Sequence, residues 1–188
     1  MPKYLEFEVS LIGIAPRIWR RFLLANNSTF ADLHEAIQGS LGWESDHLYE
    51  FRDKKGRETI ARADFEGADD DDAPTVDEVA LASFFKRTGT KCIYVYDFGD
   101  NWTHAVQLKG FMELADTFHR RLLDGARACP PEDCGGTYGY ERCVEAAGVS
   151  EEEIEKSEDE DLLDRKEWVG DWNPEEFDLA AVKKNFDY

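Results

Sequence analysis

The sequence lacks most features that mark secreted or membrane-spanning proteins. It has only four cysteines in 188 residues and no charged-then-apolar leader, which favours free thiols or metal ligands over a disulfide framework. No apolar run approaches the roughly 18 residues that a membrane span needs. We therefore expect a cytoplasmic protein without a membrane partner.

Basic residues are also scarce. Lysine and arginine number 22 against 41 aspartates and glutamates, which gives a formal net charge of −19. A surplus of this size repels phosphate backbones and argues against a general nucleic-acid binder. The net charge remains compatible with a protein as the partner.

What is present suits one folded unit. Hydrophobic residues make up 42% of the chain and aromatic residues 13%, enough for a substantial core. No repeat or linker divides the sequence. We expect a single domain over residues 1–188, with residues 149–188 as an acidic helical C-terminal extension packed on the rest.

Hydrophobic periodicity predicts both strands and helices. Alternation of apolar and polar residues predicts strands at 4–12, 17–24, 47–53, 92–98 and 101–110. Helical spacing predicts a helix at 30–41, ending at Gly42, and further helices at 138–147, from 151 to 167, and from Pro174 onward. The fold class that follows is α+β, a mainly antiparallel sheet with helices covering one face. The run Asp69–Asp72 predicts a solvated acidic loop.

The two strands at 92–98 and 101–110 are expected to form a hairpin. Gly99, Asp100 and Asn101 between them belong to the residue types that reach positive φ at low cost. The turn would bring Asp97, Asp100 and His104 together, with His47 on the neighbouring strand.

This cluster has two interpretations. Carboxylates beside imidazoles could hold a divalent cation or act as general acid and base. Alternatively, Asp97 and Asp100 accept backbone amides of their own turn, and His104 is an ordinary strand residue.

A second candidate is the loop that carries Cys129 and Cys134. Two thiolates in one tight loop can share a zinc ion, with further ligands from His104, His47, Cys92 or Cys143. A buried pair of thiols or a loop disulfide are the alternatives.

Other polar residues favour structural explanations. Arg17, Arg20 and Arg21 could bind phosphate beside Trp19, but cross-strand pairing with Glu6 and Glu8 is the preferred interpretation. His34 and His119 fall on predicted helices and are interpreted as solvent-facing or packing residues.

Five sequence blocks occur together in one order. They are Ala15–Arg21, Asp32–Gln38 with Gly42–Trp43, His47–Phe51, Tyr96–His104 and Cys129–Gly136. In these blocks the chain resembles the plasmid pRiA4b ORF-3-like family. The resemblance implies a single α+β domain of bacteria and archaea, often encoded on plasmids or mobile elements, and it carries over no catalytic residues.

Some members of that family bear a transposon-resolvase-like label, which the residues do not support. A serine recombinase needs an activated serine among arginines and a basic DNA-binding region. We expect instead an uncharacterised plasmid- or mobile-element-associated protein that acts as a non-catalytic interaction or binding module. The alternative is a metal-dependent hydrolase that uses Asp97, Asp100, His104 and His47 with zinc or another divalent metal.

Overall fold

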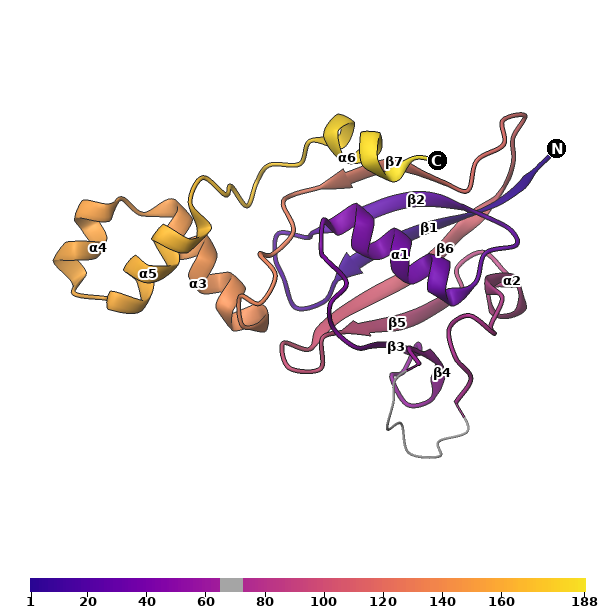
Figure 1. Ribbon diagram of the computed structural model, residues 1–188, viewed down its shortest axis with the longest axis horizontal. Coiled ribbons are helices and arrows are strands. Elements are labelled where there is room, and N and C mark those ends of the chain that lie inside the picture. Colours follow the sequence, from indigo (N-terminus) through magenta and orange to yellow (C-terminus); the bar gives the residue numbers. More distant parts are fainter. Residues whose placement is uncertain (65–72) are drawn as a thin grey trace.

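One antiparallel sheet organises the protein (Figure 1). The computed structural model describes residues 1–64 and 73–188, so the predicted acidic loop Asp69–Asp72 lies outside the described residues. Seven strands follow the order β4-β3-β5-β6-β1-β2-β7. Their bounds are β1 Lys3–Leu11, β2 Trp19–Ala25, β3 Tyr49–Asp53, β4 Thr59–Arg62, β5 Lys91–Tyr96, β6 Trp102–Glu113 and β7 Arg120–Ala126.

Helices lie on and beside this sheet. They are α1 Phe30–Leu41, α2 Leu81–Phe84, α3 Gly136–Gly148, α4 Glu151–Ser157, α5 Glu160–Val169 and α6 Leu179–Phe186. The combination confirms the predicted α+β class. Within the described residues, no helix has both the length and the apolarity to cross a membrane.

The predicted hairpin is formed by β5 and β6. Tyr96 pairs with Trp102, and Tyr94 pairs with His104. Positive φ falls on Asp97 (54°) and Asn101 (55°) rather than on Gly99. The strand at 47–53 is shorter than predicted because β3 begins at Tyr49, which leaves His47 in the preceding loop.

Strands β4 and β7 were not predicted, because each buries little. In β7 only Leu122 is buried, so its sequence shows no alternation, although it pairs with β2 at the sheet edge. In β4 only Ala61 is buried. Both strands are defined by hydrogen bonding to a neighbouring strand rather than by hydrophobic alternation in their own sequence.

Helix α1 confirms its predicted bounds and both of its ends. Thr29 and Asp32 form a reciprocal capping box, and Gly42 ends the helix in the left-handed region at φ 86°. The helix packs Phe30, Leu33 and Ile37 into the core on one face of the sheet (Figure 1).

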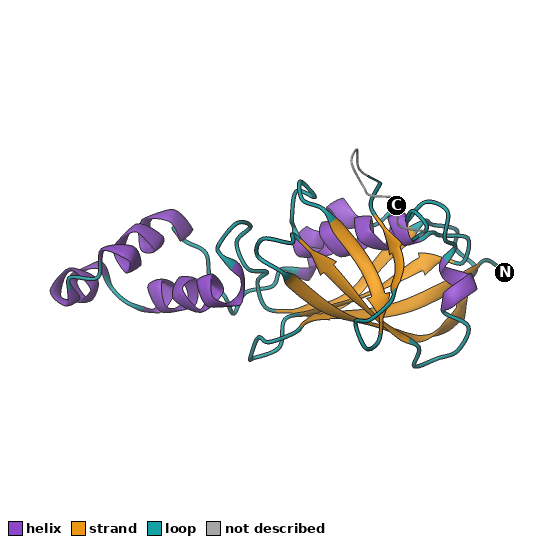
Figure 2. Cartoon of the chain, turned by 90° about the horizontal axis from the view of Figure 1, so that it is seen from below, coloured by secondary structure: helices purple, strands orange, loops and turns teal. Residues whose placement is uncertain are grey.

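The C-terminal helices differ from the prediction. The expected helix over 151–167 is split at Glu158, which has φ 58°, and Asp159 caps α5. Helices α3 to α5 pack on one another and project from the sheet, as Figure 2 shows. Ala146, Ile154 and Leu162 form a small cluster of their own, whereas Tyr140 and Cys143 of α3 belong to the main core. The last helix starts at Leu179 rather than Pro174 and returns to α1 and β7.

The predicted cross-strand pairs are present on the outer face of β1 and β2. Arg17 pairs with Glu8, and Arg21 with Glu6. Arg20 points the other way and is 2% exposed. Its guanidinium, stacked 4.0 Å from the ring centroid of Phe177, donates to the main-chain carbonyls of Trp19, Ser40, Ala126 and Arg127. Arg20 therefore links β2 to the end of α1, to β7 and to the C-terminal segment.

Replacing Arg20 with methionine should lower the free energy of unfolding by about 3 kcal/mol or more. The substitution keeps much of the side-chain volume but leaves several buried carbonyls without a donor, at about 1–3 kcal/mol each. Arg21→Met, on the same strand with a side chain 42% exposed, should cost about 1 kcal/mol or less. Urea denaturation measures both values, and equal losses would contradict this account of Arg20.

Candidate functional site

Three segments meet at the end of the sheet where β5 turns into β6. They are the 43–48 loop that leads into β3, the 97–101 turn, and the Cys129–Gly136 loop between β7 and α3. The main-chain amide of Asp97 donates to Leu48 O at 3.0 Å, which joins the first two segments.

The Cys129–Gly136 loop is fastened to the sheet end by side-chain hydrogen bonds. Trp43 Nε1 donates to Pro130 O at 3.0 Å. The two carboxylate oxygens of Glu132 accept from different groups, one from the Glu44 amide at 2.8 Å and one from the Tyr96 hydroxyl at 2.5 Å. Burial and the Glu132 carboxylate raise the pKa of Tyr96, so its hydroxyl keeps its proton and remains a donor.

His47 lies between two carboxylates at this end of the sheet. Its Nε2 is 3.0 Å from Asp133 Oδ1 and 3.9 Å from Asp97 Oδ2. One ligand-type atom from each of the three residues lies within 4.8 Å of the others. The other oxygen of Asp97, Oδ1, accepts from the Gly99 amide at 2.9 Å, which fixes the carboxylate. The structure thus brings two of the four residues of the expected cluster, His47 and Asp97, together with Asp133.

Asp100 contacts a different group. Its Oδ2 accepts from the amide of Gly135 at 3.0 Å, which ties the turn to the start of α3. The approach is close, because a Cβ added at Gly136 would lie 2.7 Å from Asp100 O. Asp100 therefore positions the Cys129–Gly136 loop, and its carboxylate is bonded away from His47.

His104 is fully buried in β6 and faces the core rather than the turn. Its Nδ1 lies 3.4 Å from Tyr94 O, and its ring packs edge-on against Trp43 at 5.5 Å between centroids. Among the residues that the structure describes, its Nε2 has no hydrogen-bond partner. Burial lowers the pKa of His104 to about 4, so the imidazole is neutral at pH 7. The alternation of β6 places His104 on the inner face with Trp102 and Val106.

His34 belongs to a buried polar network that the sequence did not predict. Its Nδ1 lies 2.7 Å from the Tyr94 hydroxyl and its Nε2 2.5 Å from Ser45 Oγ. Its ring stacks on Tyr49 at 3.5 Å between centroids, and burial lowers its pKa to about 3. The residue is thus packed rather than solvent-facing. His119, predicted on a helix, lies just before β7 and contacts Asp32.

The four cysteines are free thiols. Cys134 Sγ faces Gly136 O at 3.8 Å, and burial raises the pKa of this thiol to about 12. Within the described residues, the group of three ligand-type side chains is His47–Asp97–Asp133, and no cysteine belongs to it. Cys134 is buried and Cys129 is partly buried.

Asp133 and Glu132 are candidate site residues that the sequence did not single out. Both lie between Cys129 and Cys134, in a loop where the sequence predicted zinc binding by the two cysteines. Asp133 is 86 residues from His47, so no local spacing connects them.

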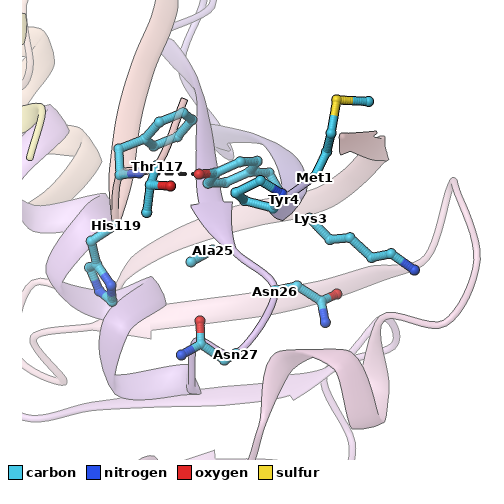
Figure 3. A pocket seen from close by; sticks show the side chains of 10 residues that line it. Met1, Lys3, Tyr4, Ala25, Asn26, Asn27, Thr117 and His119 are labelled. Atoms are coloured by element: carbon cyan, nitrogen blue, oxygen red, sulfur yellow. Dashed lines mark hydrogen bonds between the residues drawn. The ribbon is translucent and has the colours of Figure 1, made fainter. Parts of the chain in front are cut away.

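A pocket of about 760 Å³ opens at the opposite end of the sheet (Figure 3). Its lining includes Lys3, Tyr4, Asn26 and His119, whereas the register of β1 on β6 puts the hairpin turn at the far end. The side chain of Lys3 points away from the middle of the pocket. The sequence-predicted site residues do not line this cavity.

Comparisons with known proteins give the chain a family. The model of plasmid pRiA4b ORF-3-like proteins matches residues 3–181. The chain belongs to this family. The uncharacterized protein y4hQ of Sinorhizobium fredii is similar to this pRiA4b ORF-3-like protein. The two sequences are 34% identical over 145 residues, which cover 75% of this chain and 71% of y4hQ.

A solved structure shares the fold of this pRiA4b ORF-3-like protein. The crystal structure of MM3350, a protein of unknown function from Methanosarcina mazei Go1, superposes with a TM-score of 0.79 and 33% identity over 97% of this chain and 98% of the other. The predicted family and fold class are confirmed. Neither relative's name states an activity, so function must be argued from the site.

Replacing His104 with phenylalanine should make the protein less sensitive to acid. An unfolded imidazole binds its proton near pH 6.5, above the pKa of about 4 in the fold, so stability is lost as the pH falls between these values. From pH 7.5 to 5 this group should cost on the order of 2 kcal/mol. Denaturation of both proteins at the two pH values measures it, and an identical fall in the variant would refute the assignment.

Proposed function

We propose that this protein is a non-catalytic binding module that engages a partner protein through the sheet end. The proposal is carried by one observation: large apolar side chains are exposed on the segments that meet there. They are Leu48 and Phe98, which is 49% exposed, joined by Tyr138 in the first turn of α3, which directly follows the third segment and is 70% exposed. Exposed apolar groups on neighbouring segments are typical of interaction sites, and aromatic residues are enriched in interfaces.

Charge defines the chemistry of the partner. Glu44, Asp46 and Asp133 are exposed on the same segments, and the chain as a whole carries −19. Complementary potentials steer association, so a partner with basic residues around an apolar patch fits this surface. We call Leu48, Phe98 and Tyr138, with these three carboxylates, the sheet-end surface.

The alternative, a metal-dependent hydrolase, requires His47, Asp97, Asp100 and His104 to converge on one point in a concave site. Asp100 is bonded to Gly135 instead, and His104 is buried against Trp43. The pocket of about 760 Å³ lies at the other end of the sheet, and a smaller one of about 360 Å³ beside Trp43 and Glu132 is lined by none of these four residues. These placements favour the binding module over the hydrolase.

The cellular setting is also part of the proposal. Four free thiols are typical of a reducing compartment, which supports the cytoplasm. The family description, a plasmid ORF-3-like protein, supports an origin on a plasmid or other mobile element.

Photo-crosslinking in cells of the natural host tests the surface. Benzoylphenylalanine at position 98 should give a discrete covalent adduct, whereas the same group at position 111 should give none. Phe111 is a matched control, because it is 52% exposed and lies at the opposite end of β6 from the turn. Equal labelling at both positions, or none at 98, would overturn the proposal.

A double variant, Phe98→Ser with Tyr138→Ser, should abolish recovery of the partner identified by that adduct. Its unfolding free energy should stay within about 0.5 kcal/mol of the parent, as is usual for exposed positions. Phe111→Ser should retain the partner. Quantitative co-purification and thermal denaturation measure these outcomes.

A further inference from the structure

We propose that His47, Asp97 and Asp133 form a binding site for a divalent transition-metal ion such as Zn²⁺ or Mn²⁺. An imidazole nitrogen and two carboxylate oxygens already lie within 4.8 Å of one another. These residues lie in or beside the sheet-end surface, but the inference goes beyond partner binding and does not depend on it.

The distances suit a small ion after minor adjustment. Metal–ligand bonds of about 2.0–2.2 Å place neighbouring ligand atoms roughly 3 Å apart. His47 Nε2 and Asp133 Oδ1 are separated by 3.0 Å, and Asp97 Oδ2 is 3.9 Å from the same nitrogen. The side chain of Asp133 is 70% exposed and so can rotate toward an ion.

Electrostatics also favours a cation here. Within the described residues, His47 is the sole basic side chain within 4.0 Å of either carboxylate. Asp100 and Glu132 add negative charge through the same turn and loop. A divalent ion would offset this local excess of negative charge.

The donor set selects the class of metal. Mg²⁺ and Ca²⁺ prefer oxygen ligands throughout, whereas imidazole suits the transition metals and zinc. Three protein ligands leave positions for water, since the site is partly exposed. Thiolate ligation is not needed, because within the described residues the three ligand-type side chains that lie together include no cysteine.

The three ligands come from three different segments. His47 lies before β3, Asp97 follows β5, and Asp133 lies in the loop that leads into α3. A bound ion would therefore cross-link the base of the projecting helices to the sheet. Hydrogen exchange in the Cys129–Gly136 loop should slow when metal is added.

Calorimetric titration of the chelator-treated full chain with Zn²⁺ alone, and then with Mn²⁺, tests the site. One ion should bind per chain, and Asp133→Asn should weaken binding by more than about tenfold, because even outer-shell changes cost that much. Asp46→Asn is the matched control: it removes an exposed carboxylate one residue from His47 and should leave the Kd within about twofold.

Imidazole NMR supplies a second readout. Of the four histidines, His47 should show the dominant Zn²⁺-dependent shift, and His47→Gln should abolish it. Unaltered binding in Asp133→Asn, or no binding to the parent chain, would overturn the proposal. So would a thiolate charge-transfer band with Co²⁺ that disappears in a Cys129→Ser, Cys134→Ser variant. Crosslinking at position 98 needs no added metal. Failure of the metal site can therefore be distinguished from failure of partner binding.

Discussion

The hydrogen bonds that fasten the Cys129–Gly136 loop to the end of the sheet are the constraint on which the rest of the site depends. Glu132 accepts from Tyr96 and from the Glu44 amide, so one carboxylate spans β5 and the 43–48 loop. Charge-assisted bonds of this kind are roughly twice as strong as neutral ones. They place Asp133 beside His47, and they set where α3 begins.

The glycines that close this loop have a steric cause. Gly135 and Gly136 both have positive φ, at 94° and 66°, a region that costs other residues conformational energy. Gly136 additionally lies against the carbonyl of Asp100. The turn after β5 and the start of α3 can therefore approach closely only with glycine at this position.

The sheet and the projecting helices α3 to α5 are stabilised by different interactions. The sheet and α1 are held by a large apolar core with buried polar links at Arg20 and His34. Helices α3 to α5 share a much smaller apolar cluster around Ala146, Ile154 and Leu162. Ion pairs such as Arg142 with Asp159 supplement it, and surface pairs contribute little stability individually. Tyr140 and Cys143 of α3 belong to the main core, so the start of the projecting helices is attached to the sheet by apolar contacts as well as by the loop.

Local sequence patterns were sufficient to predict those elements that bury one face. The hairpin of β5 and β6, the capping box at Thr29 and the stop at Gly42 were all predictable, because alternation, caps and glycine act over a few residues. The burial of His104 was also within reach of the sequence, since it shares the parity of Trp102 and Val106 in its strand. Strand β7 was out of reach, because pairing with β2 rather than its own pattern defines it.

The sequence by itself determined the family, the α+β class and the turn that presents Asp97. Tertiary structure alone decided that Asp133 joins His47, that Asp100 bonds to Gly135 and that the helices after Gly136 project away. The two contacts connect residues far apart in the chain, and the projection of the helices follows from how the loop before them is attached. Their proximity results from strand order and loop anchoring, which no local periodicity encodes.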